Sequence, residues 1–346
     1  MTSVVVYPAD TGRCGHRLIW PTQALIDQGA DVRLVTPDAE SGAQLRATFR
    51  RYADGTRVLD DVEDPEADVV VFQRPLQRTL ADAIPVLQAK GIRVVVEIDD
   101  DFTTISARNV SWANCHPKFH PERNWDHLAR ARKQADLVTV TTPALAQRYA
   151  RHGRVAIIPN HIPASYLSIE REPHDGVVVG WTGSIETHPN DLQVTRGGVA
   201  RAVEATGATF AVVGTGKGVR KALDLKEQPL SSGWVPLDAY PRALAHFDVG
   251  IVPLELTAFN ESKSALKGLE FAALGVPFVA SPTGPYQVVP VAAIARRPRD
   301  WEREVRSLIE SQGSRLGVAS ALRHWASTQT VEGNCERWWE AWISSI

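Results

Sequence analysis

The 346-residue sequence lacks the features of a disulfide-stabilised, zinc-binding or membrane-spanning protein. Its three cysteines, Cys14, Cys115 and Cys335, are far apart and form no C-x-x-C pair, so neither a disulfide framework nor a metal site is expected. No apolar run approaches the roughly 18–20 residues of a membrane-spanning helix. The chain starts directly with an apolar segment, without a basic and then apolar leader. These absences predict a cytoplasmic protein, or one at the periphery of a membrane, with no integral membrane segment.

The sequence also has little net charge. It contains 38 basic and 40 acidic residues, a formal charge of −2, which excludes a strongly basic nucleic-acid-binding domain but not a local basic patch. Arg46, Arg50 and Arg51 could form a face for a phosphate-rich acceptor or a membrane, although a solvated helix face is the preferred interpretation. Methionine occurs once, and this arginine-rich, methionine-poor composition is typical of a GC-rich genome. A phage protein in a bacterial host therefore stays among the alternatives.

Short, nearly continuous Val/Ile runs alternate with longer amphipathic stretches, a pattern that predicts parallel strands buried on both faces. We expect strands at 4–7, 31–35, 67–72, 92–98, 135–140 and 155–158. After a connector at 160–175 we expect strands at 177–181, 210–213, 249–252 and 277–280, with helices at 192–205 and 264–274. The predicted fold class is α/β, with two Rossmann-like domains over 1–163 and 164–320 whose parallel sheets face each other across a cleft, and a helix over 321–346 returning to the first domain.

The most informative segment is 259–281, FNESKSALKGLEFAALGVPFVAS. A loop is expected to enter a helix, in which Lys263 and Glu270 lie about 20° apart and Lys267 about 60° from Glu270. A helix N-terminus and a lysine attract an anion, and a carboxylate further along can accept bonds from two neighbouring hydroxyls. A diphosphate followed by a ribose fits this order of groups. An ordinary amphipathic surface helix is the alternative interpretation.

Segment 260–281 resembles the signature region of GT-B-fold glycosyltransferases, in the group related to the retaining family that uses nucleotide sugars. In that family two glutamates stand eight positions apart, and the second, matched by Glu270, binds the nucleotide ribose. The first falls at Ser262, so the pattern is broken where the family contacts the transferred sugar; the adjacent Glu261 is a candidate substitute. The arrangement of Lys263, Ser264 and Lys267 resembles a subset in which lysine takes over diphosphate binding.

Other segments support the same resemblance. Gly183 and Ser184, followed by His188, resemble the first loop of the nucleotide domain, where backbone N–H groups approach phosphate. Gly214 stands where the family has a second glycine turn. Val235 lies in a segment that resembles the one contacting the base through its backbone.

The first half of the chain matches more loosely. Gly12 and Gly15 follow the first strand, where the family has a glycine loop near the donor phosphate, although a plain strand-to-helix turn explains them equally well. Asp99, Asp100 and Asp101 follow the strand at 92–98. They could bind acceptor hydroxyls or act as a base, coordinate a metal, or cap a helix.

The resemblance implies a hexosyl- or pentosyltransferase that moves a sugar from a UDP- or GDP-sugar to an acceptor hydroxyl, with retention and without a metal or other cofactor. The expected catalytic residues are Lys263, Asp99, Asp100 and His188. A sugar-nucleotide epimerase of the same fold and a non-catalytic sugar-nucleotide binder are the alternatives. The acceptor stays open between polysaccharide, lipid, small molecule and modified DNA base, as does the oligomeric state.

Overall fold

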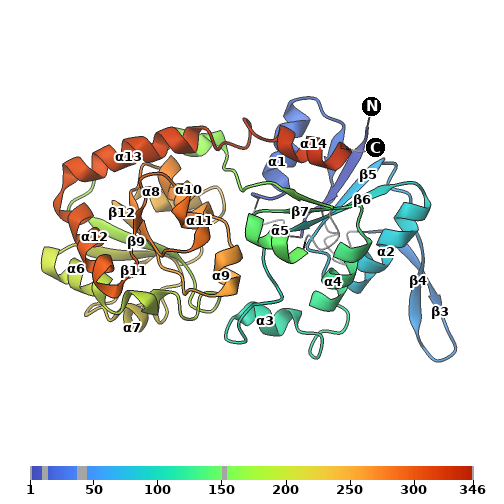
Figure 1. Ribbon diagram of the computed structural model, residues 1–346, viewed down its shortest axis with the longest axis horizontal. Coiled ribbons are helices and arrows are strands. Elements are labelled where there is room, and N and C mark those ends of the chain that lie inside the picture. The colour runs from blue at the N-terminus through green and yellow to red at the C-terminus, as the bar shows by residue number, and fades with distance from the viewer. Residues whose placement is uncertain (1, 10–14, 37–44, 150–153, 345–346) are drawn as a thin grey trace. The chain divides into compact units, whose positions relative to one another are not determined.

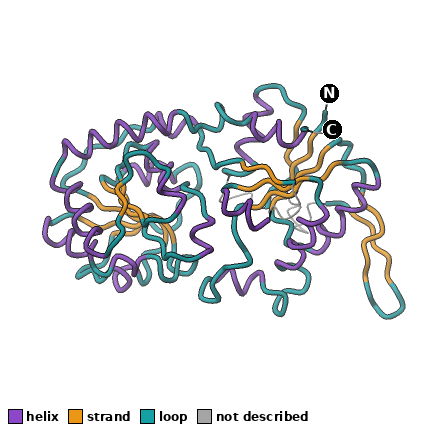
Figure 2. The backbone as a smooth tube through the Cα atoms, in the orientation of Figure 1, coloured by secondary structure: helices purple, strands orange, loops and turns teal. Residues whose placement is uncertain are grey.

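A computed structural model describes residues 2–9, 15–36, 45–149 and 154–344 of the chain. Its helices and strands are shown in Figures 1 and 2. The chain divides into two compact units. Unit 1 comprises Met1–Ile105, Ser111–Asn160 and Asn334–Ile346, and unit 2 comprises Ser106–Val110 and His161–Gly333.

Unit 1 contains a six-stranded, all-parallel sheet. In sheet order its strands are β2 (Val32–Leu34), β1 (Val4–Tyr7), β5 (Val69–Gln73), β6 (Arg93–Ile98), β7 (Leu137–Val140) and β8 (Val155–Ile157). The helices are α1 (Ile19–Asp27), α2 (Arg78–Ala89), α3 (Val110–Cys115), α4 (Trp125–Gln134), α5 (Pro143–Tyr149) and α14 (Glu336–Ile343). The valine runs of β1 and β5 are buried throughout, as expected for strands covered on both faces.

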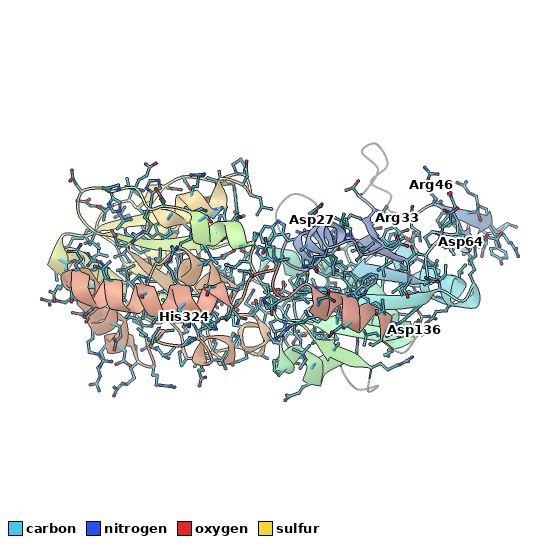
Figure 3. All side chains as sticks on the ribbon, turned by 90° about the horizontal axis from the view of Figure 1, so that it is seen from above. Asp27, Arg33, Arg46, Asp64, Asp136 and His324 are labelled. Atoms are coloured by element: carbon cyan, nitrogen blue, oxygen red, sulfur yellow. The ribbon has the colours of Figure 1, made fainter. Side chains whose placement is uncertain are left out.

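A two-stranded antiparallel hairpin, β3 (Ala47–Arg51) and β4 (Arg57–Val62), extends from unit 1 (Figure 1). It corrects the expectation of a helix face at Arg46, Arg50 and Arg51. Alternating strand residues here are exposed, and Arg50 forms a 2.7 Å ion pair with Asp60 on the opposite strand. Cross-strand pairs of this kind stabilise a hairpin, and they would not form if the same residues were helical. Figure 3 labels Arg46 at the base of this hairpin, where its side chain is largely exposed.

Unit 2 contains a second six-stranded parallel sheet, which confirms the predicted α/β class with two parallel sheets. In sheet order its strands are β11 (Leu230–Ser231), β10 (Thr209–Gly214), β9 (Val178–Gly183), β12 (Val249–Val252), β13 (Phe278–Ala280) and β14 (Ala293–Ile294). The α-helices are α6 (Gly198–Thr206), α7 (Val219–Leu223), α8 (Tyr240–Ala245), α9 (Ala258–Ser262), α10 (Leu266–Ala273), α11 (Gly284–Gln287), α12 (Pro298–Glu310) and α13 (Gln312–Ser327). Two 3₁₀ turns are η1 (Ala164–Ser168) and η2 (Leu192–Thr195).

The expected helix over 192–205 is wrong in one respect, because it is two elements. The 3₁₀ turn η2 ends at Thr195, and α6 begins at Gly198. Between them Arg196 and Gly197 adopt left-handed backbone conformations, with φ of 44° and 70°. A right-handed helix cannot continue through such residues.

Two tryptophans of α14, Trp338 and Trp342, stand four residues apart on one face of the helix and are fully buried in unit 1. None of the helices in the described part of the chain is long and apolar enough to cross a membrane.

Candidate functional site

The strand order of unit 2 defines one preferred position for a ligand. Numbered along the unit, its strands lie in the order 3-2-1-4-5-6, so the winding reverses between β9 and β12. At such a reversal the loops that follow the two strands diverge and leave a crevice at the carboxyl ends. The loop after β9 carries Ser184 and His188, and the segment after β12 leads to Lys263. The sequence-predicted residues of unit 2 are therefore concentrated at this edge of the sheet.

Gly183 and Gly214 end β9 and β10 as a register pair with φ of 140° and 124°. A Cβ at Gly214 would lie 2.3 Å from the Gly183 carbonyl oxygen, so no larger residue fits. The N–H of Gly214 donates to Gly233 O at 3.0 Å, and its carbonyl accepts from the Ser231 hydroxyl at 2.9 Å. Gly214 thus joins two strand ends closely and uses its backbone groups within the protein. The role of Gly214 in binding the nucleotide sugar, which the resemblance implies, stays a prediction.

Ser184 begins the loop after β9 and is 2% exposed. Its hydroxyl accepts the N–H of Glu186 at 3.2 Å, and its carbonyl accepts the N–H of His188 at 3.0 Å. These bonds form a tight turn that brings His188 back over the carboxyl end of β9.

The helix predicted over 264–274 is confirmed as α10, but it begins only at Leu266 and follows a separate short helix, so Lys263 lies outside it. Thr257 caps α9 by accepting the Asn260 N–H, and α9 ends at Ser262. Lys263 is extended, with φ of −65° and ψ of 159°, and α10 begins only at Leu266. The expectation that Lys263 shares a helix face with Glu270 is therefore wrong, because Lys263 precedes the helix. It remains close to the first turn of α10.

Two lysines lie near each other in this segment. Burial and then the charge of Lys263 lower the pKa of Lys267 to about 8, although Asp191 and Glu270 oppose this effect. The Lys267 ammonium lies 5.8 Å from the centre of the Trp181 ring, and that of Lys263 lies 4.5 Å from the Phe259 ring. Two cations that destabilise each other at the start of a helix favour an anionic ligand.

His188 links Lys267 to Asp191. Its Nδ1 lies 2.7 Å from Asp191 Oδ2, and its Nε2 lies 3.4 Å from Lys267 Nζ. Burial, followed by the charge of Lys267, lowers the pKa of the His188 imidazole to about 3, although the bond to Asp191 opposes this shift. His188 is therefore neutral at physiological pH. Asp191 is 4% exposed and was not among the residues predicted from the sequence, although its spacing of three from His188 is a signal for this contact.

Glu270 lies in α10 and is 3% exposed. The Tyr240 hydroxyl donates to its Oε2 at 3.2 Å, and the Thr182 hydroxyl lies 3.1 Å from the same Tyr240 oxygen. Burial raises the pKa of Glu270 to about 7, against the opposing effects of the Tyr240 hydrogen bond and the Lys267 charge. Sequence reasoning missed Tyr240, because a contact across 30 residues leaves no local signal.

The two positions considered for the family's first glutamate have other roles here. The Ser262 hydroxyl donates to Phe259 O at 2.7 Å and is almost fully buried. Glu261 accepts the backbone N–H of Gly284 at 2.8 Å, at the start of α11. Ser264 lies partly buried in the break between α9 and α10, and Val235 lies partly buried between β11 and α8. The structure thus brings Gly183, Ser184, His188, Lys263, Lys267 and Glu270 to the carboxyl edge of one sheet.

The remaining predicted residues belong to unit 1. Gly12 lies outside the described residues. A Cβ at Gly15 would lie 2.5 Å from the Trp20 ring, which explains a glycine there by packing. Asp99 follows β6 and lies 3.4 Å from the Arg74 guanidinium, and Asp100 next to it is partly buried. Both lie at the carboxyl edge of the first sheet.

Asp101 forms a local turn rather than a ligand site. It is fully buried, accepts from the hydroxyls of Thr103 and Thr104 at 2.6 and 2.7 Å, and pairs with Arg148. Asp101 therefore does not cap a helix, because residues 102–104 form a turn. Within the described ranges no group of three or more His, Cys, Asp or Glu side chains could hold a metal ion.

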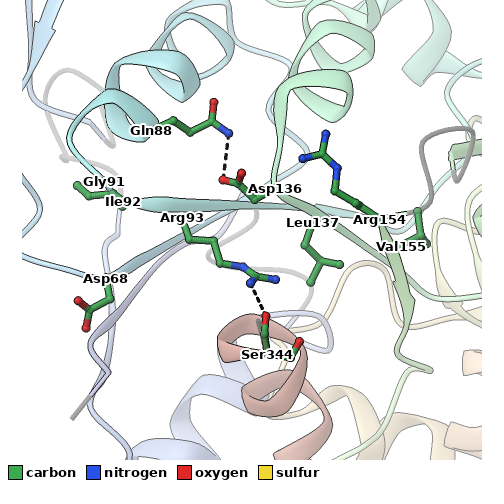
Figure 4. A pocket seen from close by; sticks show the side chains of 10 residues that line it. All are labelled: Asp68, Gln88, Gly91, Ile92, Arg93, Asp136, Leu137, Arg154, Val155 and Ser344. Atoms are coloured by element: carbon green, nitrogen blue, oxygen red, sulfur yellow. Dashed lines mark hydrogen bonds between the residues drawn. The ribbon is translucent and has the colours of Figure 1, made fainter. Parts of the chain in front are cut away.

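A cavity of about 680 Å³ lies at the opposite, amino-terminal edge of the first sheet (Figure 4). Among its lining residues, Gln88 donates to Asp136 at 3.0 Å, and Arg93 donates to the Ser344 carbonyl. It contains none of the predicted site residues.

The sequence matches no family model and no curated protein. The structure, in contrast, is similar to that of Anabaena HepE in complex with UDP and glucose, with a TM-score of 0.65 and 13% identity over 100% of both chains. An E. coli structure described as trehalose-6-phosphate bound with UDP-2-fluoro glucose gives a TM-score of 0.63 and 12% identity, again over 100% of both chains. Sucrose-phosphate synthase from Thermosynechococcus elongatus gives 0.63 and 12% over 98% of each chain.

At these identities the similarity establishes the fold. The chain has two Rossmann-like domains of the GT-B type along its full length, as the sequence resemblance predicts.

Proposed function

We propose that this protein is a glycosyltransferase that moves a sugar from a nucleoside-diphosphate sugar to an acceptor hydroxyl. One observation carries the proposal. Lys263 and Lys267 stand with the buried carboxylate of Glu270 at the point where the winding of a Rossmann-like sheet reverses. These groups have the charges and the order that a diphosphate joined to a ribose requires.

The two lysines and the first turn of α10 would bind the diphosphate and stabilise its charge as the sugar departs. Gly183 and Ser184 would bring backbone close to the phosphates, and Val235 would approach the base. Glu270 would accept hydrogen bonds from the ribose hydroxyls beside the bond from Tyr240, since a carboxylate accepts about four. Asp99 and Asp100 of unit 1 would bind the acceptor hydroxyl.

A uridine nucleotide is the first donor to test, because the HepE structures contain UDP, UDP with glucose, and UDP-glucose. We propose transfer of a hexose or pentose with retention of configuration and without a metal, as the family resemblance implies. Polysaccharides, lipids, small metabolites and modified DNA bases form the acceptor panel.

Nucleotide binding tests the donor site directly. The protein would be screened by thermal shift and calorimetry against UDP, GDP, ADP, dTDP and their sugar conjugates. A ligand at a hundred times its Kd should stabilise the fold by about 2.7 kcal/mol. Lys263→Ala and Glu270→Ala should abolish the shift, whereas Lys226→Ala and Glu227→Ala, on an exposed surface of unit 2, should retain it. No shift with any nucleotide would refute the proposal.

The activity is tested on the nucleotide sugar that binds. Slow release of sugar to water without an acceptor indicates transferase chemistry. Conversion of the nucleotide sugar to its epimer would identify an epimerase instead, and tight binding without either reaction in the presence of the acceptor panel would identify a binder.

A further inference from the structure

Three side chains of unit 2 form a hydrogen-bonded chain that ends at Lys267. Asp191 Oδ2 lies 2.7 Å from His188 Nδ1, and His188 Nε2 lies 3.4 Å from Lys267 Nζ. The sequence predicts His188 as a catalytic residue without a defined task. The contacts on either side of the imidazole ring provide one.

Asp191 is fixed as a hydrogen-bond acceptor. Its Oδ1 accepts the Glu255 N–H and the Asn260 side-chain N–H, both at 2.8 Å. Burial raises the pKa of this carboxyl, but the hydrogen bonds from His188 and Glu255 act together with nearby positive charge such as that of Lys267, and the net effect is a lowered pKa. An ionised carboxylate cannot donate, so the proton between the two side chains belongs to His188 Nδ1.

The other ring nitrogen is then determined as well. With its proton on Nδ1, the neutral imidazole presents a lone pair at Nε2. Lys267 Nζ is the group at hydrogen-bonding distance, and an ammonium only donates. The charged groups that act on Lys267 are Lys263 from the end of α9, Asp191 from the start of η2, and Glu270 from its own helix. A neutral acceptor orients the ammonium without adding a third positive charge.

We infer that His188 is a positioning residue: held in its Nδ1–H tautomer by Asp191, it accepts one N–H of Lys267 and directs the remaining ammonium hydrogens to the donor diphosphate. The inference rests on the proposed function and deepens it. It states that His188 and Asp191, which do not touch the diphosphate, set the orientation of the Lys267 ammonium that does. The same arrangement makes diphosphate binding sensitive to which tautomer His188 adopts.

Calorimetry with UDP and with uridine tests the inference, because uridine lacks the phosphates. His188→Ala should weaken UDP binding about tenfold, the loss typical of one hydrogen bond to a charged group, and leave uridine binding unchanged. His188→Gln, which retains an acceptor oxygen, should recover part of the loss. The exposed His246→Ala is the matched control.

Asp191→Asn provides the sharper test. An amide that keeps its oxygen toward Glu255 and Asn260 turns its N–H group toward His188, so the imidazole carries its proton on Nε2, facing Lys267. UDP binding should weaken about a hundredfold, more than in His188→Ala. Once His188 is alanine, Asp191→Asn should cost little more, a non-additivity that a structural role alone does not produce.

The pH profile adds an independent signature. UDP affinity of the wild type should fall as pH rises through about 8, where Lys267 loses its proton. In His188→Ala this limb should move to lower pH, because the ammonium has lost an acceptor. Long-range proton–nitrogen NMR of the wild type should show His188 as the neutral Nδ1–H tautomer from pH 5.5 to 9, and a proton on Nε2 would overturn the inference even where a variant does not fold.

The two proposals fail differently. A wild type that binds neither UDP nor GDP refutes the donor site and, with it, the role of His188. A wild type that binds UDP, with affinities and pH profiles unchanged in His188→Ala and Asp191→Asn, refutes only the role of His188.

Discussion

Replacing Glu270 with glutamine should stabilise the folded protein while it abolishes nucleotide binding. The carboxyl is almost fully buried and accepts a hydrogen bond from Tyr240. Glutamine has nearly the same shape and can accept the same bond, but it carries no charge. Glu270→Gln therefore removes the energetic cost of a buried charge together with the group that would bind the ribose.

The magnitude follows from the pKa. Burial raises the pKa of Glu270 from 4.5 to about 7. Because the folded state holds this proton more tightly than the unfolded state, its contribution to stability is complete below pH 4.5 and is lost as pH rises through about 7. Raising the pKa from 4.5 to about 7 corresponds to about 3 kcal/mol. The wild type bears this full cost above pH 8, and the glutamine variant does not.

Urea denaturation at several pH values from 4.5 to 8.5 measures the effect, following the transition of unit 2. The comparison must be the difference between the variant and the wild type. His188, with a pKa lowered to about 3, gives the wild type an opposite trend in stability up to its unfolded value of 6.5. That contribution is common to both proteins and cancels. The difference should be near zero at pH 4.5 and about 3 kcal/mol in favour of the variant at pH 8.5.

A difference that stays constant with pH, or a variant less stable than the wild type at pH 8.5, would show that the Glu270 carboxylate is well solvated or well paired and would refute the reasoning. Glu227→Gln, at an exposed position of the same unit, should change stability by less than about 0.5 kcal/mol at every pH. Calorimetry on the same samples should show UDP binding lost only in Glu270→Gln.

Three further predictions concern stability and pH. Gly214→Ala should lower the free energy of unfolding by about 2–4 kcal/mol in urea denaturation, because the new Cβ would meet a carbonyl oxygen and the backbone φ is 124°. Gly313→Ala, in open space at the start of α13, is the control and should leave this free energy unchanged or raise it by up to about 1 kcal/mol. Arg17 forms a fully buried 2.7 Å ion pair with Glu97, so Arg17→Met should cost about 3–5 kcal/mol by leaving the Glu97 charge uncompensated. Arg50→Met, in an exposed pair, should cost at most about 1 kcal/mol, and equal losses by thermal or urea unfolding would contradict this contrast. Tyr240→Phe removes a hydrogen bond that lowers the pKa of Glu270. UDP binding that needs the Glu270 carboxylate increases as this group ionises, so the midpoint of that increase should move to higher pH in the variant. An unchanged pH profile by calorimetry would argue against the Tyr240 bond.

The sequence predicts the sheets better than it predicts the helices between them. Continuous valine runs such as β5 are determined by burial on both faces, which local composition records directly. The hairpin β3–β4 has no such signal, because its stability depends on contacts between strands, and its arginines suit a helix surface equally well. The division at Arg196 and Gly197 could have been found from the adjacent glycines of the sequence, since glycine readily adopts positive φ.

The candidate site shows the same limit. The order of Lys263, Lys267 and Glu270 along the chain was enough to predict a diphosphate and ribose site at the end of one strand. Two contacts around these groups were not predicted: Tyr240 donates to Glu270 and Asn260 donates to Asp191, and the paired residues stand 30 and 69 positions apart in the chain. Tertiary structure determines those contacts, and a spacing rule does not contain them.

The serine at position 262 connects the broken family pattern to the position of Lys263. Its hydroxyl donates to the Phe259 carbonyl three residues earlier, a bond that an ionised glutamate cannot make. Such local bonding competes with helix continuation, and α9 ends at this residue. Lys263 can then extend toward the start of α10, close enough to Lys267 to lower its pKa. The end of α9 at Ser262 and the extended backbone at Lys263 thus place two lysines near the start of α10, the helix that carries Glu270.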